Sequence, residues 1–127
     1  MPNEQVDFWP DFTNASLRTP VTLLREQAAL LGPKTQQLVV ADVESMASGE
    51  NFYHRFYLLV PTLDNYRYEL FALSHSILLY PATVSYKSMG IHIENEEALK
   101  TWLKNVLSSK ETTKIIEALL AQAKRDV

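Results

Sequence analysis

Residues 52–73 read FYHRFYLLVPTLDNYRYELFAL, two runs of aromatic and aliphatic residues joined by the segment 61–65. Period-two alternation on both sides of a Pro-to-Asn turn is typical of an antiparallel β-hairpin. All six tyrosines of the chain lie between residues 53 and 86, so they belong to the same region. The sequence therefore predicts an antiparallel sheet with a tyrosine-rich surface.

The flanking segments extend this hairpin into a larger sheet. Four strands are predicted, at 36–46, 52–60, 66–73 and 77–86. The connections are short and rich in turn residues, such as Ser74-His75-Ser76, which indicates a meander. Pro81 lacks an N–H group, so the fourth strand is expected to be an edge strand or to be bulged there. Residues 91–93 are a candidate for a short fifth strand.

A helix is predicted before the sheet. Thr19 is a good N-cap, and Pro20 suits the first helical position. Leucines repeat at helical spacing after it. Gly32 followed by Pro33 is a strong stop signal, because glycine adopts the left-handed conformation and proline cannot continue the helix. We expect this helix at about 20–31.

Two helices are predicted after the sheet. Asn95 caps the first, and residues 108–111, SSKE, match a capping box for the second. The brief break between them predicts an αα-hairpin. The predicted fold class is therefore α+β, with an N-terminal helix, a four-stranded antiparallel meander and a C-terminal helical hairpin, in the order αββββαα.

Length and composition limit the classes of function. The 127 residues suit one domain, and we expect a single α+β domain at 17–127 preceded by an extended arm at 1–16. The arm carries the patch Phe8-Trp9-Pro10-Asp11-Phe12, which is expected to pack onto the domain or onto a partner. The net charge of −3 gives no reason to bind nucleic acid. Neither a signal peptide nor an apolar run of ~20 residues is present, so no membrane association is expected.

The chain contains no cysteine, which excludes disulfides and thiolate metal sites. A reducing compartment is the natural setting for such a chain, so a cytoplasmic location is expected. The three histidines show no metal-ligand spacing, and the glycines are too scattered for a phosphate loop. His54 is expected to be a satisfied core residue, and His75, in a predicted turn, to be solvated. No catalytic residue, metal or cofactor is predicted.

Alternation assigns the strand residues to two faces, if the hairpins are symmetric about Leu63 and His75. The face expected to form the core under the helices holds Phe52, Phe56, Leu58, Tyr68, Leu70, Ile77 and Leu79. The second face holds Tyr53, Arg55, Tyr57, Arg67, Glu69, Phe71, Tyr80 and Tyr86. Tyrosine and arginine are enriched at protein interfaces. Four explanations for the second face stay open: cover by the helices or the arm, a homodimer interface, a protein or peptide partner, and a small-molecule cleft.

The sequence predicts a non-enzymatic binding or assembly module that uses this second face for homodimerisation or for a protein partner. The candidate partner-binding residues are Tyr53, Arg55, Tyr57, Glu69 and Tyr80. The alternative is a small-molecule-binding protein or weak enzyme, with a pocket between the sheet and the C-terminal helices. In size and composition the chain is similar to small acidic secretion chaperones, which combine terminal helices with one antiparallel sheet and dimerise. Those chaperones place a helix inside the sheet region, so no residue role is transferred.

Overall fold

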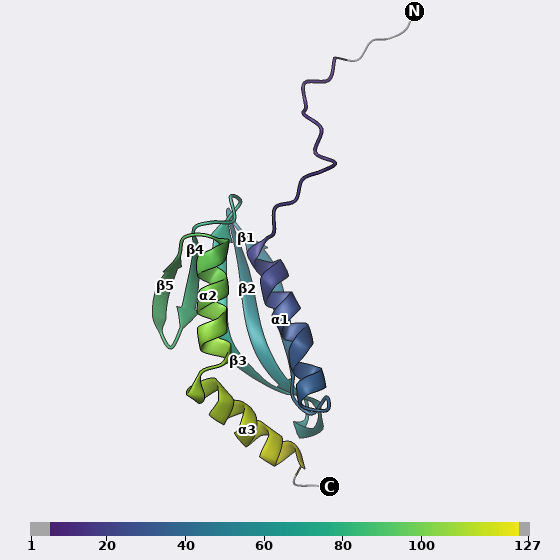
Figure 1. Ribbon diagram of the computed structural model, residues 1–127, viewed down its shortest axis with the longest axis vertical. Helices are drawn as coiled ribbons and strands as arrows, with labels where there is room; N and C mark the ends of the chain where they lie inside the picture. Colours follow the sequence, from purple (N-terminus) through teal and green to yellow (C-terminus); the bar gives the residue numbers. More distant parts are fainter. Residues whose placement is uncertain (1–5, 125–127) are drawn as a thin grey trace, which may run out of the picture.

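The computed structural model describes residues 6–124 and has an α+β fold with three helices and one antiparallel sheet (Figure 1). Its elements are α1 (Pro20–Lys34), β1 (Val40–Ser48), β2 (Asn51–Val60), the short 3-10 helix η1 (Pro61–Leu63), β3 (Tyr66–Ser76), β4 (Ala82–Tyr86), β5 (Met89–Ile93), α2 (Glu96–Leu107) and α3 (Lys110–Lys124). The strands pair in chain order from β1 to β5, which confirms the predicted meander but with five strands instead of four.

The third and fourth strands differ from their predicted bounds. β3 continues through the predicted turn at 74–76, because β2 is long enough to pair with it as far as Asn51 opposite Ser76. Residues 77–81 form a loop, and β4 starts only at Ala82. The peptide bond between Tyr80 and Pro81 is cis. The candidate fifth strand is present and pairs with β4 through a two-residue turn.

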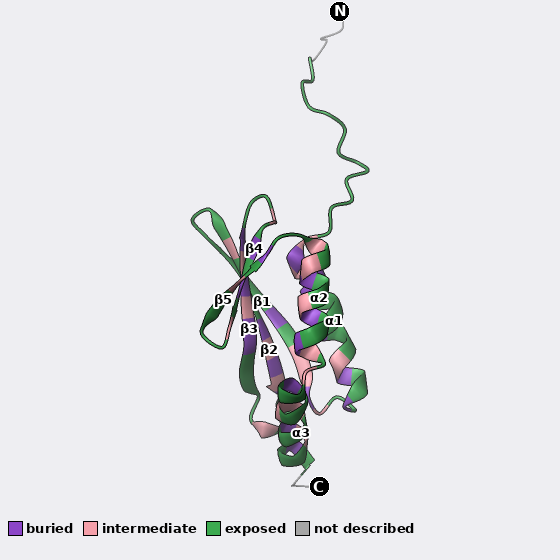
Figure 2. Cartoon of the chain, turned by 60° about the vertical axis from the view of Figure 1, so that its left-hand side comes forward, coloured by how far each residue is buried: buried purple, intermediate pink, exposed green. Residues whose placement is uncertain are grey.

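The sheet has helices on one face only. α1 lies over β1 and β2, α2 lies beside it over the later strands, and no helix of residues 6–124 lies on the opposite face of the sheet (Figures 1 and 2). The main core fills the space between these two layers and includes Leu24, Phe56, Leu73, Val84 and Leu99. The fold is thus two layers thick and leaves one broad sheet surface bare.

A bulge in β3 changes the predicted face of one aromatic residue. Phe56 pairs with Phe71, whereas the next residue, Tyr57, pairs with Glu69, so Leu70 is the extra residue. The irregularity lets Leu70 and Phe71 both be buried, although strict alternation would place them on opposite faces. The prediction that Phe71 lies on the second face is therefore wrong.

The first helix does not stop at Gly32 and Pro33 as predicted, but ends at Lys34. A proline in the last turn removes only one intrahelical hydrogen bond, and the chain reverses directly afterwards. Thr35 caps this end: its backbone N–H donates to the carbonyl oxygen of Gly32. Its hydroxyl lies 2.6 Å from the carbonyl oxygen of Val39, to which it donates. The predicted N-cap at Thr19 is confirmed, because its hydroxyl accepts the Thr22 N–H.

The last two helices do not form the predicted hairpin. Asn95 and Ser109 cap α2 and α3, accepting N–H groups of Ala98 and Thr112. However, α3 starts where α2 ends and runs on past the end of the sheet instead of folding back along α2 (Figures 1 and 2). Leu119 and Ala123 of α3 pack on Val39, Leu58 and Val60, and together these residues form a second apolar cluster. α3 therefore packs mainly on residues at this end of the sheet.

The N-terminal segment extends away from the folded body in both views (Figures 1 and 2). The predicted arm covers residues 1–16, of which residues 1–5 lie outside the described part of the chain. Residues 6–16 contain no helix or strand and are exposed throughout. The aromatic patch of the arm therefore does not pack on its own domain here.

Candidate functional site

Four of the five predicted partner-binding residues share the sheet face that carries no helix. Tyr53, Arg55 and Tyr57 alternate with buried residues along β2, and Glu69 pairs with Tyr57 across β3. Arg67 lies on the same face, two residues from Glu69. We call the following six residues the open face: Tyr53, Arg55, Tyr57, Arg67, Glu69 and the adjoining Glu44 of β1.

Charged and aromatic side chains contact one another across the open face. The guanidinium carbon of Arg67 lies 3.9 Å from the ring centroid of Tyr57, within cation–π range. Arg67 Nη2 also lies 3.1 Å from Glu44 Oε2. Arg55 Nε lies 3.8 Å from Glu69 Oε1. Exposed pairs of this kind contribute little to stability, so the open face is an organised surface rather than a source of folding energy.

Tyr80 and Tyr86 do not belong to the open face, contrary to prediction. Tyr80 lies in the loop before β4 and packs against the main core, where burial raises the pKa of its hydroxyl. Tyr86 contacts Trp102 of α2 edge-on, at 5.6 Å between ring centroids. The loop at 77–81 moves the centre of the second hairpin away from His75, and a register change of this kind exchanges the two faces of a strand.

The predicted core face is correct near the hairpin of β2 and β3 and wrong at its other end. Phe56, Leu58 and Leu70 are buried. Tyr68 pairs with Leu58 on the predicted side of the sheet but is 36% exposed. Ile77 is exposed and Leu79 lies half-buried in the loop. The cause is the same for Ile77 and Leu79, because neither residue is part of a strand.

Nothing in the described chain covers the open face. The helices pack on the opposite side of the sheet, and residues 6–16 point away from it (Figure 2). Tyr53 keeps 38% of its surface exposed, and Met46 on the neighbouring strand keeps 56%. Within residues 6–124, cover by the helices or by the arm is therefore not observed.

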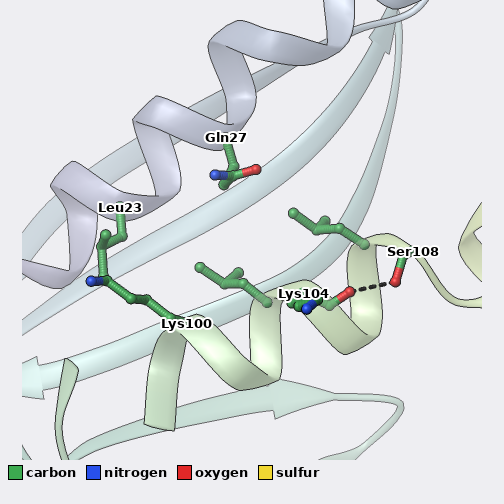
Figure 3. Close-up of a pocket in the computed structure, with 7 residues that line it drawn as sticks. Leu23, Gln27, Lys100, Lys104 and Ser108 are labelled. Atoms are coloured by element: carbon green, nitrogen blue, oxygen red, sulfur yellow. Dashed lines mark hydrogen bonds between the residues drawn. The ribbon is translucent and has the colours of Figure 1, made fainter. Parts of the chain in front are cut away.

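A second candidate site is a groove between α1 and α2, which the sequence did not indicate (Figure 3). We call it the helix groove; its hollow has a volume of about 390 Å³ and is lined by Leu23, Gln27, Lys100, Leu103, Lys104, Leu107 and Ser108. Lys100 pairs with Glu96, 3.1 Å away, and its pKa is raised by that contact. Lys104 forms no ion pair with any residue among 6–124. The groove thus combines an apolar floor with positive charge.

The helix groove continues into a smaller apolar hollow under α1. This inner hollow measures about 180 Å³ and shares Gln27 and Leu107 with the groove. Its other lining residues come from α1, from the sheet and from α3, among them Leu31, Phe56 and Ile116. It lies between the sheet, α1 and the two C-terminal helices. Trp102 does not line it, because its ring packs between Phe71 and Tyr86.

The third candidate is a buried pair of histidines on the helix side of the sheet. His54 and His75 are 5% and 7% exposed, and their Nε2 atoms lie 3.0 Å apart. The expectation for His54 is confirmed, whereas His75 is buried in β3 rather than solvated. The sequence did not predict this pair. Its two members are 21 residues apart, and they meet because β3 includes the residues of the predicted turn.

The hydrogen bonds of the histidine pair form a directed chain. The carbonyl oxygen of Ser76 only accepts, so His75 Nδ1, 2.7 Å away, donates to it. With both rings neutral, His75 Nε2 then accepts from His54 Nε2, and His54 Nδ1 accepts from the Ser45 hydroxyl at 2.8 Å. Arg25 of α1 reaches Ser45 Oγ at 3.4 Å.

The electrostatics of the histidine pair favour a structural role. Burial, followed by the charges of His75 and Arg25, lowers the pKa of His54 to about 4. An imidazole with such a low pKa is a weak base towards a serine hydroxyl. The chain Ser45–His54–His75 therefore satisfies buried polar groups and links β1, β2 and β3, and it is poorly suited to activate a nucleophile.

Comparison with known proteins adds no assignment: no family model, no curated protein and no solved structure matches the chain. Over the described residues, no group of three or more histidine and carboxylate side chains is placed to hold a metal ion. Similarly, none of the three described helices is long and apolar enough to cross a membrane. The two surface sites, the open face and the helix groove, are left as the candidates for binding.

Proposed function

We propose that the chain is a non-enzymatic assembly module that forms a homodimer through the open face. One observation carries this proposal: among residues 6–124, no helix covers the sheet face that bears the exposed Tyr53 and the half-buried Tyr57, because the helices pack on the other side. Aromatic side chains with polar tips lose little by leaving water at an interface. A second sheet is the natural cover for such a surface, because two sheets pack face to face about 10 Å apart.

The charges of the open face suit contact with a copy of itself. Two arginines, Arg55 and Arg67, alternate with the carboxylates of Glu44 and Glu69. In a two-fold interface the same patch meets itself, so mixed charges can pair across the axis without like charges meeting. A single-sign patch would favour a partner of opposite charge instead. The mixed pattern supports a second copy over an acidic or basic partner.

Sedimentation equilibrium of matched tyrosine variants tests this proposal. We expect the wild type to self-associate and Tyr53→Ala/Tyr57→Ala to shift to a lower mass, with association through the open face weakened about tenfold or more. Tyr66→Ala is the control, because Tyr66 is also exposed but pairs with Val60 on the other side of the sheet. A double variant with the same mass profile as the wild type would contradict the proposal.

The alternative function, binding of a small molecule, is supported by the apolar inner hollow. Its volume of about 180 Å³ lies below the roughly 300–1,000 Å³ of typical ligand pockets. A ligand would therefore have to continue into the helix groove. Thermal-shift measurements with a metabolite library test this: a rise in Tm that is lost in Leu31→Trp, which fills the hollow, would favour the ligand over the assembly module.

The absence of cysteine supports a reducing compartment, and we propose a cytoplasmic location. Fractionation of cells that express the chain with a small epitope tag tests this. Recovery of the tagged chain outside the cytoplasmic fraction would argue against it.

A further inference from the structure

The arm presents large apolar side chains that are mostly exposed. Phe8 and Trp9 are 89% and 79% exposed, and Phe12 follows them with 63% exposed. Isolated exposed apolar residues are common, but three aromatics within five residues form a patch that is costly to leave in water. Such a segment is suited to bury its side chains in a groove of another molecule.

The arm is also acidic and partly ordered. Asp7 accepts the N–H of Trp9 at 3.0 Å, and Asp11 accepts the N–H of Thr13 at 2.9 Å. The hydrogen bonds from Thr13 lower the pKa of Asp11, so this carboxylate is ionised at neutral pH. These local turns, together with Pro10, reduce the conformational entropy that the segment loses on docking.

The helix groove has an apolar and positively charged lining that is complementary to this segment. The apolar floor of the groove consists of Leu23, Leu103 and Leu107, and Lys100 and Lys104 add positive charge to its lining. Lys100 forms an ion pair with Glu96, whereas Lys104 has no carboxylate partner among residues 6–124. An aromatic segment carrying two aspartates therefore matches the groove in both hydrophobicity and charge.

The direction of the arm favours a groove on another copy. Thr19 enters α1 with an extended backbone, φ −80° and ψ 155°, and Arg18 is paired with Glu26 on the side of α1. The arm leaves the start of α1 in the direction away from the bodies of α1 and α2 (Figures 1 and 2), and these two helices supply the residues that line the helix groove. Docking in the same chain would require the arm to reverse within the few residues before Thr19.

We propose that residues 7–12 of each arm dock in the helix groove of a second copy, so that two chains exchange their arms. Trp9 and Phe12 lie over the apolar floor, and Asp11 lies beside Lys104. This contact uses a surface on the opposite side of the sheet from the open face. It therefore goes beyond the proposed dimer and stands or fails independently of it.

An exchange of charges tests the arm contact. Asp11→Lys and Lys104→Glu are each expected to weaken self-association about tenfold, because each places like charges together. A mixture of the two variants restores it, since the lysine introduced into the arm of one chain then meets the glutamate introduced into the groove of the other, while the reverse contact is that of the wild type. Native mass spectrometry distinguishes the mixed species by mass. Lys114→Glu, an exposed site on α3, is the control for net charge.

The same measurements in the Tyr53→Ala/Tyr57→Ala background separate this contact from the open face. In this background, association through the arms is expected to persist. The further change Trp9→Ala/Phe12→Ala is expected to abolish it. Because both residues lie outside the folded domain, this change leaves the Tm of the domain unchanged. The proposal is overturned if the charge variants associate like Lys114→Glu, or if their mixture forms no mixed species. It is also overturned if the arm docks in its own chain, in which case Trp9 becomes protected while the mass stays monomeric.

Discussion

At the scale of single residues, the histidine pair is the feature that the sequence describes least well. The expectation that His54 is a satisfied core residue is correct, because Phe52 and Phe56 flank it in a strand. Its partner is not predictable in the same way, because the length of β3 depends on pairing with β2 and not on its own turn-forming residues. Because this pair is buried, it is expected to make the stability of the fold depend on pH in mildly acidic solution.

The histidine pair predicts a loss of stability in mild acid. The pKa of His54 is about 4 in the folded chain and close to 6.5 when unfolded, so protons bind the unfolded state first. The contribution of neutral His54 is therefore complete above pH 6.5 and is lost as the pH falls towards 4, at a total of about 3 kcal/mol. Urea unfolding at several pH values between 4 and 7.5 measures this loss.

Two histidine variants identify the source of that pH dependence. His54→Gln keeps a polar side chain but cannot titrate, and it should flatten the curve between pH 6.5 and 4. His92→Gln is the matched control, because His92 is exposed on β5 and pairs only with Glu94. Equal pH profiles for His54→Gln and the wild type would show that His54 is not responsible.

At the scale of elements, the predictions are correct where the turn is placed correctly. The predicted hairpin of β2 and β3 is centred at 61–65, so Tyr53, Tyr57 and Arg67 are assigned to the right face. The following loop is predicted a few residues too early, which exchanges the faces of β4 and misplaces Tyr80. Strand pairing is a relation between distant residues, and one sequence determines its register only as well as it determines its turns.

The turn between β1 and β2 allows a direct test of hairpin geometry. Gly49 has a φ of +62°, which side chains other than glycine rarely adopt. Gly49→Ala is expected to lower the free energy of unfolding by about 1 kcal/mol, although no atom lies within 4 Å of the added methyl group.

The control for this variant is Gly90→Ala. Gly90 lies in β5 without a positive φ, and its added methyl group would lie 3.8 Å from Thr83 Cγ2, an ordinary contact. Chemical denaturation should therefore give a free energy of unfolding close to that of the wild type. If both variants lose the same stability, backbone strain at residue 49 is not the cause.

At the scale of the whole molecule, the described part of the chain has two apolar clusters rather than one. The amphipathic pattern of the last helix predicts a buried face correctly, but not the surface against which it packs. That surface is built from Val39, Leu58 and Val60, where β1 and β2 meet beyond the end of α2. The helix groove escapes prediction for the same reason: its leucines and lysines come from helices that the sequence does not place side by side.

The second cluster predicts that α3 is integral to the fold. Leu119 is 7% exposed against this cluster, so Leu119→Ala should cost about 2–4 kcal/mol through lost burial and an unfilled cavity. Leu78→Ala, at a leucine that is 78% exposed in the loop before β4, should change stability by less than about 0.5 kcal/mol. Thermal unfolding that gives one transition, lowered only for Leu119→Ala, meets this expectation; an unchanged Tm would refute it.

The order of the strands also bears on how quickly the chain folds. Every strand pairs with the strand that follows it, and two of the four connections are turns of only two residues, 49–50 and 87–88. Most sheet contacts therefore close short loops, and low contact order is associated with fast folding. The sheet can form pair by pair as the chain emerges during synthesis, with α1 waiting beside β1 and only α2 and α3 docking late. An N-terminal fragment that ends after β3 should accordingly already protect the amides of the first hairpin from exchange.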